Sequence, residues 1–93
     1  MKYFPTLEDT VTPMLSDDYE KRLLAEYWQT KIRYERLRYA LMSTEQEDEV
    51  KPNSHLDNLL QLWSDQIEAM KDYLDVLEER LVFEGVEYLE AEK

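Results

Sequence analysis

Two long stretches of the chain repeat their apolar residues at helical spacing. The second stretch alternates steps of four and three residues for more than three heptads. Such spacing places one apolar stripe along one face of an α-helix. The pattern therefore predicts an all-α fold, an antiparallel two-helix hairpin in a single domain. The stripes comprise Leu23, Tyr27, Thr30, Tyr34, Leu37 and Leu41 in the first stretch, and Leu56, Leu60, Trp63, Ile67, Met70, Leu74, Leu77 and Leu81 in the second.

Polar residues before the first stretch predict where its helix begins. Asp17 is followed three residues later by Glu20, the spacing of a capping box, in which each residue bonds to the other's backbone N–H. We therefore expect the first helix over residues 17–44. Residues 45–53 contain an acidic run and Pro52, which stops a helix, and are predicted to form a loop.

The second helix is predicted to cover residues 54–90. Ser54 is a favourable N-cap, and Asp57 in the first turn complements the helix dipole. Gly85 is the only glycine in the chain, and we expect it to mark a kink or a fraying point within this helix.

Residues 1–16 form a short N-terminal segment that is interrupted by Pro5 and Pro13. A helical turn is expected to start near Thr6, and Thr12 is expected to cap a helix that begins at Pro13. The segment is rich in apolar residues, so we expect it to pack against the hairpin or against a neighbouring subunit.

Each helix also carries a second apolar stripe, which an antiparallel partner does not cover. Leaving these side chains in water costs about 25 cal/mol per Å² of apolar surface, and we expect Trp28, Tyr39, Tyr73 and Phe83 to be exposed in a monomer. Association into a homo-oligomer removes this cost. The second stripes comprise Leu24, Trp28, Ile32, Tyr39 and Met42, and Leu59, Leu62, Ala69, Tyr73, Val76 and Phe83, the latter interrupted by Gln66 and Arg80.

The composition excludes several classes of function. The 93 residues have a net charge of −11 and contain no cysteine, which fits a reducing compartment and rules out thiolate metal sites. No apolar run approaches the roughly 20 residues that span a bilayer, and we expect an intracellular protein with no membrane partner. An acidic chain is also a poor ligand for DNA, whose binding depends on many contacts between cations and phosphates.

Residues typical of enzyme active sites are nearly absent. The chain has one histidine, His55, which is insufficient for a metal site, and it has no glycine-rich phosphate loop. No histidine is positioned to activate a serine or threonine nucleophile. We therefore predict a protein that is not an enzyme and has no cofactor.

The charge is unevenly distributed, and the first helix holds a local cationic stripe. Residues 17–42 carry six cations against five carboxylates, whereas residues 51–93 carry four against 11. A phenol can stack on a nucleobase, and a guanidinium group can hold phosphate oxygens in a bidentate contact. Within a sector about 160° wide lie Tyr19, Arg22, Glu26, Arg33 and Arg36.

A second interpretation is that these cations form ion pairs across the hairpin. In the predicted hairpin, residues 31–38 lie opposite residues 57–68, which contain Asp57, Asp65 and Glu68. The spacing of the residues leaves both interpretations open. Exposed ion pairs contribute only about 0–1 kcal/mol each to stability.

The segment Gln66–Leu81 resembles a signature of a family of small phage proteins, Gln-Leu-x-Ala-Met-x-x-Tyr-x-x-Ile-Leu-x-x-Arg-Ile. The first helix agrees with the family's Tyr-x-x-Arg-Val-x-x-Glu-Tyr pattern through Tyr19, Arg22, Leu23, Glu26 and Tyr27, and further on through Arg33, Tyr34 and Leu37. These are the anti-CBASS proteins, which sequester the cyclic oligonucleotide messengers of a bacterial immune system. In the second helix the residues in register are Gln66, Ile67, Ala69, Met70, Tyr73, Val76, Leu77, Arg80 and Leu81.

The resemblance implies a homo-oligomer, typically a hexamer, in the host bacterial cytoplasm. It implies that cyclic dinucleotides bind between subunits, that cyclic trinucleotides bind separately in some members, and that neither ligand is turned over. Tyr19 and Arg33 take the positions of the family's ligand contacts, and Arg80 is a candidate for an anion site between subunits. Arg22 and Arg36 are the remaining candidates for ligand binding.

The chain also departs from the family pattern. Arg33 replaces the usual lysine, Trp28 and Tyr34 replace aliphatic residues, and the acidic loop over residues 45–49 is longer than usual. The alternative function is therefore a phage or bacterial helical interaction or adaptor protein that has no nucleotide ligand.

Overall fold

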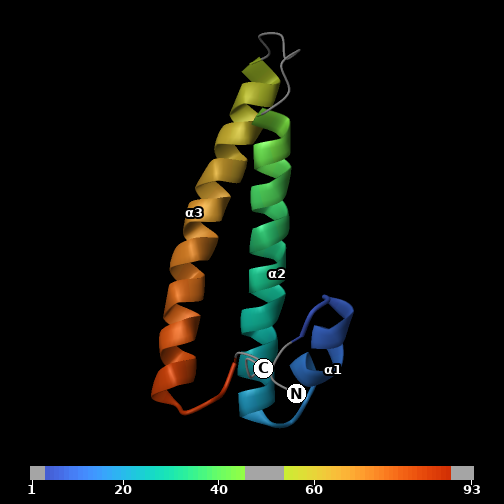
Figure 1. The fold of residues 1–93 in the computed structure, drawn as a ribbon, viewed down its shortest axis with the longest axis vertical. Helices are drawn as coiled ribbons and strands as arrows, with labels where there is room; N and C mark the ends of the chain where they lie inside the picture. The colour runs from blue at the N-terminus through green and yellow to red at the C-terminus, as the bar shows by residue number, and fades with distance from the viewer. Residues whose placement is uncertain (1–3, 46–53, 89–93) are drawn as a thin grey trace, which may run out of the picture.

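The structure is a computed structural model that describes residues 4–45 and 54–88. Its elements are the 3₁₀ turn η1 (Glu8–Thr10) and the helices α1 (Val11–Met14), α2 (Tyr19–Glu45) and α3 (Ser54–Phe83). The helices α2 and α3 lie side by side and run in opposite directions, and α1 lies against α2 on the side away from α3 (Figure 1). The described residues contain no strand. The predicted all-α hairpin is confirmed.

The first long helix begins with Asp18 as its cap, rather than with Asp17 as predicted. The Asp18 side chain accepts a hydrogen bond from the backbone N–H of Glu20 at 3.0 Å, and the Asp18 carbonyl accepts one from the backbone N–H of Arg22. The Ser16 hydroxyl in turn accepts from the backbone N–H of Asp18 at 3.0 Å. This turn at Ser16 moves the first helical residue to Tyr19, so Asp17 lies outside the cap.

The second long helix ends at Phe83, so the prediction that it continues to residue 90 is wrong. Gly85 takes a left-handed conformation with φ of 76°, which glycine adopts without steric cost. Its N–H donates to the carbonyl of Val82, and the N–H of Val86 donates to the carbonyl of Leu81 at 2.8 Å. These two bonds form a Schellman motif, which terminates the helix and turns the chain back.

The N-terminal segment packs on α2, as one of the two predicted arrangements has it. Thr6 and Asp9 cap each other: the backbone N–H of each donates to the side chain of the other, both at 3.2 Å. The predicted turn near Thr6 is confirmed. The predicted helix start at Pro13 is wrong, because α1 continues directly from η1 and begins at Val11.

The buried core lies at the end of the hairpin where α2 begins and α3 ends. There the predicted seams meet, and both are confirmed as the inner faces of the two helices. Toward the loop that joins α2 and α3, the seam residues are only half-buried. The buried apolar residues are Phe4, Leu23, Leu24, Ala25, Tyr27, Trp28, Leu74, Leu77 and Leu81.

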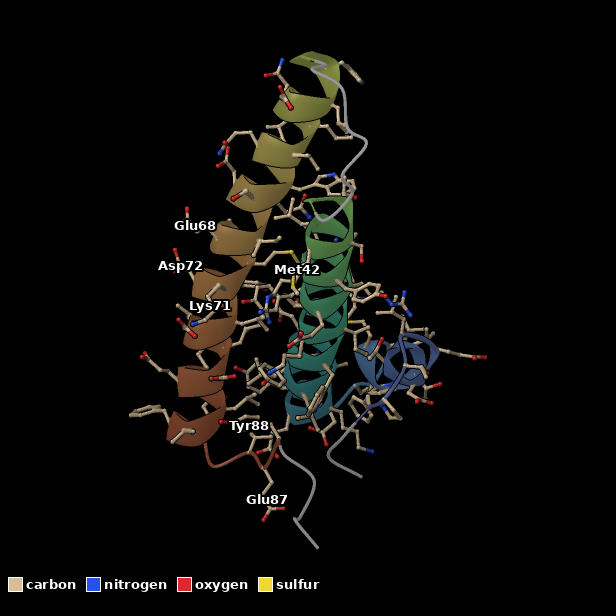
Figure 2. All side chains as sticks on the ribbon, turned by 45° about the horizontal axis from the view of Figure 1, so that its top comes forward. Met42, Glu68, Lys71, Asp72, Glu87 and Tyr88 are labelled. Carbon is tan, nitrogen blue, oxygen red and sulfur yellow. The ribbon has the colours of Figure 1, made fainter. Side chains whose placement is uncertain are left out.

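Trp28 is covered within one chain, which contradicts the expectation that a monomer leaves it exposed. Its side chain is 7% exposed, and its indole N–H donates to the carbonyl of Tyr88 at 3.0 Å. The Tyr27 ring meets the rings of both Trp28 and Tyr88 edge to face. Tyr88 reaches this position because the chain turns back after α3 (Figure 2). The other predicted exposed aromatics, Tyr39, Tyr73 and Phe83, are exposed.

Candidate functional site

Two of the predicted ligand-binding residues meet at the end of the hairpin. The Arg80 Nη2 atom of α3 donates a hydrogen bond to the Tyr19 hydroxyl at the start of α2, at 2.6 Å. The same hydroxyl donates to the Glu84 carboxylate at 3.1 Å, and Arg80 Nε lies 3.8 Å from that carboxylate. Tyr19, Arg80 and Glu84 therefore form one connected cluster, which we call the Tyr19 cluster. Because the antiparallel arrangement brings the start of α2 beside the end of α3, residues 61 positions apart are in contact.

The Tyr19 cluster is polar, charged and accessible to solvent. The hydrogen bond with Tyr19 raises the pKa of Arg80, and the negative charges of Glu84 and Glu26 act in the same direction. The guanidinium group therefore stays protonated. It has five N–H donors, and its side chain is 41% exposed, so donors remain for a second anion.

Arg22 lies one turn beyond Tyr19 on α2, but it stabilises the backbone rather than joining the cluster. Its Nη1 atom donates to the carbonyl of Ser16 at 2.8 Å, which holds the turn that leads into α2. One hydrogen bond leaves the rest of its guanidinium group available, and the side chain is exposed.

Arg33 lies far from the Tyr19 cluster, in a groove between α2 and the N-terminal segment. Arg33 comes fourteen positions after Tyr19, which separates them by about 21 Å along the helix axis. The structure therefore does not bring these two predicted ligand contacts together within one chain. Arg36 is exposed one turn beyond Arg33. The groove has a volume of about 410 Å³ and is lined by Leu7, Thr10, Val11, Met14, Leu15, Gln29 and Arg33.

The predicted ion pairs across the hairpin do not form among the described residues. Instead, Arg38 pairs with Glu35, Lys71 with Asp75, and Arg80 with Glu84, each with a residue three or four positions away in the chain. The cations of Lys31 and Arg38 lie instead over the rings of Tyr27 and Tyr34, at 5.9 and 5.5 Å from the ring centres.

The register of the hairpin and the directions of the side chains on α3 explain why these pairs are missing. The contact between Tyr27 and Glu78 places residues 31–38 opposite roughly residues 67–74, nearer the end of α3 than predicted. Asp57 is therefore out of reach along the helix. Asp65 lies near the level of Arg38 but accepts a hydrogen bond from the Gln61 side chain on its own helix, at 2.9 Å. Glu68 lies on the side of α3 that faces away from α2 (Figure 2).

Glu78 and Glu84 are the polar residues that the sequence did not single out. Glu78 on α3 accepts a hydrogen bond from the buried Tyr27 hydroxyl at 2.8 Å. Burial and the bond to the Glu78 carboxylate raise the pKa of Tyr27. Glu78 can be identified only when the register between α2 and α3 is known. In the sequence, a carboxylate beside a helix seam has the same pattern as any solvated charge.

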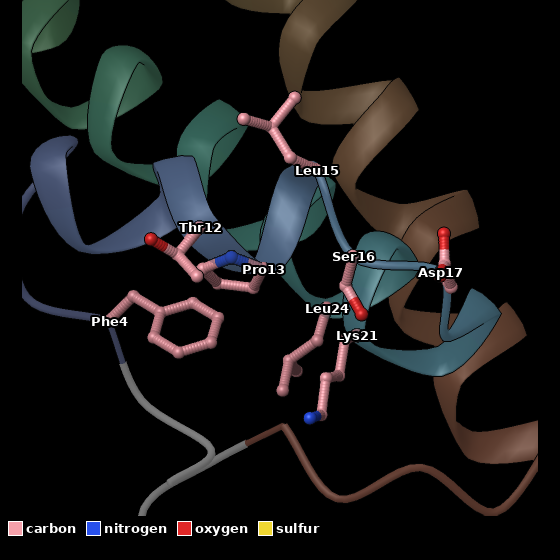
Figure 3. Close-up of a pocket in the computed structure, with 8 residues that line it drawn as sticks. All are labelled: Phe4, Thr12, Pro13, Leu15, Ser16, Asp17, Lys21 and Leu24. Atoms are coloured by element: carbon pink, nitrogen blue, oxygen red, sulfur yellow. The ribbon is translucent and has the colours of Figure 1, made fainter.

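A second groove lies on the other side of the N-terminal segment (Figure 3). It has a volume of about 600 Å³, and its wall is mostly apolar, with the Lys21 and Asp17 side chains at one end. The remaining lining residues are Phe4, Thr12, Pro13, Leu15, Ser16 and Leu24.

The described part of the chain holds no group of three residues suited to bind a metal ion. None of its helices combines the length and the apolar character needed to cross a membrane.

Comparison with known proteins identifies one related family. The family model described as Sequestin matches residues 17–83, more than two thirds of the chain. The match contains α2, α3 and all five candidate ligand-binding residues, and the N-terminal segment lies outside it. Searches of curated proteins and of solved structures gave no match.

Proposed function

This chain belongs to the Sequestin family of phage anti-CBASS sponges, and we propose that it binds and sequesters cyclic di- and trinucleotides in the host bacterial cytoplasm without turning them over. The observation that carries this proposal is the family match over residues 17–83. A sponge needs affinity and abundance but no chemical step, which agrees with our expectation that the protein is not an enzyme.

The chemistry of the Tyr19 cluster supports a ligand of this class. A cyclic dinucleotide presents two phosphates and two flat bases. The Arg80 guanidinium group can hold phosphate oxygens, and the exposed face of the Tyr19 ring can stack on a base. The net charge of −11 does not prevent binding, because charges more than about 10 Å from the site are screened at 0.1 M salt.

The absence of the predicted ion pairs across the hairpin also supports ligand binding. Arg33 and Arg36 form no ion pair within 4.0 Å among the described residues, so cross-hairpin pairing does not account for them. Both side chains are exposed on α2 and available to an anion or to another subunit.

The separation of the candidate residues favours a pocket shared between two copies. Tyr19 and Arg33 lie about 21 Å apart along α2, so a small ligand that touches both must take them from different subunits. We therefore propose that Tyr19 of one copy and Arg33 of another form opposite walls of a pocket in a homo-oligomer, in line with the hexamer that the resemblance implies.

The outer face of α3 offers a surface for this assembly. It carries a row of apolar side chains that no part of the described chain covers, whereas the equivalent side of α2 is covered around Trp28. Burying such a row against a second copy contributes about 25 cal/mol per Å². The exposed apolar residues on this face are Leu59, Leu62, Tyr73, Val76 and Phe83.

Isothermal titration against a panel of 3′,3′-linked cyclic di- and trinucleotides tests the proposal. We expect binding to the wild-type protein, and we expect Tyr19→Ala and Arg33→Ala each to weaken it at least about tenfold, since each loses a charge-assisted or stacking contact. Size exclusion should show that both variants keep the oligomer.

The controls remove the same side-chain types elsewhere on α2. Tyr39→Ala and Arg38→Ala should leave the affinity unchanged, because Tyr39 is exposed and Arg38 is paired with Glu35. The absence of heat with every ligand at micromolar protein contradicts the proposal and favours the adaptor without a nucleotide ligand.

A further inference from the structure

Glu84 places a carboxylate beside the two side chains that we assign to the ligand. One of its oxygens, Oε2, accepts from the Tyr19 hydroxyl at 3.1 Å and lies 3.8 Å from Arg80 Nε. A carboxylate is planar and a phosphate is tetrahedral, but each presents a pair of anionic oxygens that the guanidinium group binds through the same N–H donors. Within one chain, the protein thus supplies its own anion to the Tyr19 cluster.

The position of Glu84 in the fold does not account for this carboxylate. It follows directly after the last residue of α3, where the negative end of the helix dipole disfavours a carboxylate. Its side chain is 31% exposed, and an exposed pair of this kind contributes little to stability. The turn itself is held by the backbone bonds of Gly85 and Val86, which do not involve the Glu84 side chain.

The same geometry allows the Glu84 side chain to move out of the Tyr19 cluster. The side chain lies on the surface, and among the described residues its polar contacts are with the Tyr19 hydroxyl and Arg80. Rotation of its side-chain torsions moves the carboxylate into solvent without displacing the buried residues of the core. Arg80 and Tyr19 remain bonded to each other at 2.6 Å and so stay oriented for an incoming anion.

We propose that Glu84 is an internal anion that occupies the phosphate position of the Tyr19 cluster and that a ligand phosphate displaces. This inference rests on the proposed function and adds a residue that sets the affinity. The carboxylate occupies this position when no ligand is bound, and every ligand must compete with it. An anion that fails to replace both contacts is rejected, so weakly bound cellular anions are excluded from the site.

The test compares Glu84→Gln with Glu79→Gln. Both variants remove one negative charge and keep the side-chain length, but Glu79 lies on the exposed face of α3 outside the Tyr19 cluster. Each variant is titrated with a 3′,3′-linked cyclic dinucleotide, and each is also unfolded thermally in inorganic pyrophosphate and in chloride of equal ionic strength. Circular dichroism checks that both variants fold.

We expect Glu84→Gln to bind the cyclic dinucleotide about fivefold more tightly than wild type, the effect of removing one exposed competing pair. We also expect pyrophosphate to raise its melting temperature more than chloride does. Glu79→Gln should behave as wild type in both measurements. Unchanged or weaker binding by Glu84→Gln, or an equal gain in Glu79→Gln, overturns the inference.

The two arms separate this inference from the proposed function. If no variant binds a cyclic dinucleotide, the proposed function fails, and the pyrophosphate measurement alone decides whether Glu84 blocks an anion site. If Glu84→Gln also shows no stabilisation specific to pyrophosphate, Glu84 is an ordinary surface residue and the inference fails as well.

Discussion

At the scale of single residues, the burial of Tyr27 and its hydrogen bond with Glu78 make the free energy of unfolding vary with pH in the alkaline range. The Tyr27 hydroxyl is buried, and its pKa is raised above the ordinary value of 10.0. Above pH 10 the unfolded chain therefore loses this proton before the folded chain does. The contribution is present below pH 10 and is lost as the pH rises toward the folded-state pKa.

We predict that the free energy of unfolding falls more steeply above pH 10 in the wild type than in Tyr27→Phe. The difference in slope should approach about 1.4 kcal/mol per pH unit, measured by urea denaturation. Tyr39→Phe is the control, because Tyr39 is 73% exposed, and it should keep the wild-type slope. Equal slopes for wild type and Tyr27→Phe contradict the role of this bond.

Individual site residues could be predicted from the sequence only in part. Tyr19 and Arg80 came from the resemblance and from the break in an apolar stripe, and the structure places them in contact. Glu78 and Glu84 were missed, because a carboxylate next to a helix seam has the same pattern as a solvated charge. Their partners become visible only when the register between α2 and α3 is known.

At the scale of elements, two adjacent aspartates at the start of α2 have different roles. Asp18 caps the helix through its side chain, whereas Asp17 does not cap it. We predict that Asp18→Ala lowers the free energy of unfolding by about 1 kcal/mol, the usual cost of losing an N-cap. Asp17→Ala should change it by less than about 0.5 kcal/mol, as surface substitutions do. Urea denaturation of both variants gives the comparison, and the reverse order would restore the capping box that the sequence predicts.

The interiors of both long helices followed from the sequence, and their ends did not. The apolar repeats at Leu23 and Leu77 identify the buried faces because packing and periodicity agree there. The end of α3 was missed because a single glycine is compatible with a kink, a frayed turn or a complete stop. Gly85 stops the helix because Val86 can return to the core beside Leu81, a tertiary contact that periodicity does not encode.

At the scale of the whole molecule, the uncovered face of α3 predicts association. We expect Tyr73→Asp to lower the mass measured by light scattering, because it places a charge in the middle of the proposed interface. Ser64→Asp adds the same charge on an exposed position of α3 away from the apolar row and should leave the mass unchanged. An unchanged mass in Tyr73→Asp shows that this face is not the interface.

The sequence predicted the hairpin but misjudged how much of it one chain can cover. Trp28 was expected to need a second subunit, whereas it is buried within one chain and its indole N–H donates to the carbonyl of Tyr88, after α3. The reason is that short segments without strong periodicity, such as residues 4–16 and 84–88, find their positions through tertiary contacts alone. The apolar surface left for an oligomer is therefore concentrated on α3.

The central claim is that the protein sequesters a cyclic dinucleotide without changing it chemically. The most direct measurement mixes increasing protein with a fixed amount of a 3′,3′-linked cyclic dinucleotide and determines the free ligand by ultrafiltration. Guanidinium denaturation then releases the bound fraction for chromatography. The account predicts that free ligand falls in proportion to added protein and that the released ligand is chemically unchanged. Free ligand that stays constant, or a hydrolysed product after release, would contradict it.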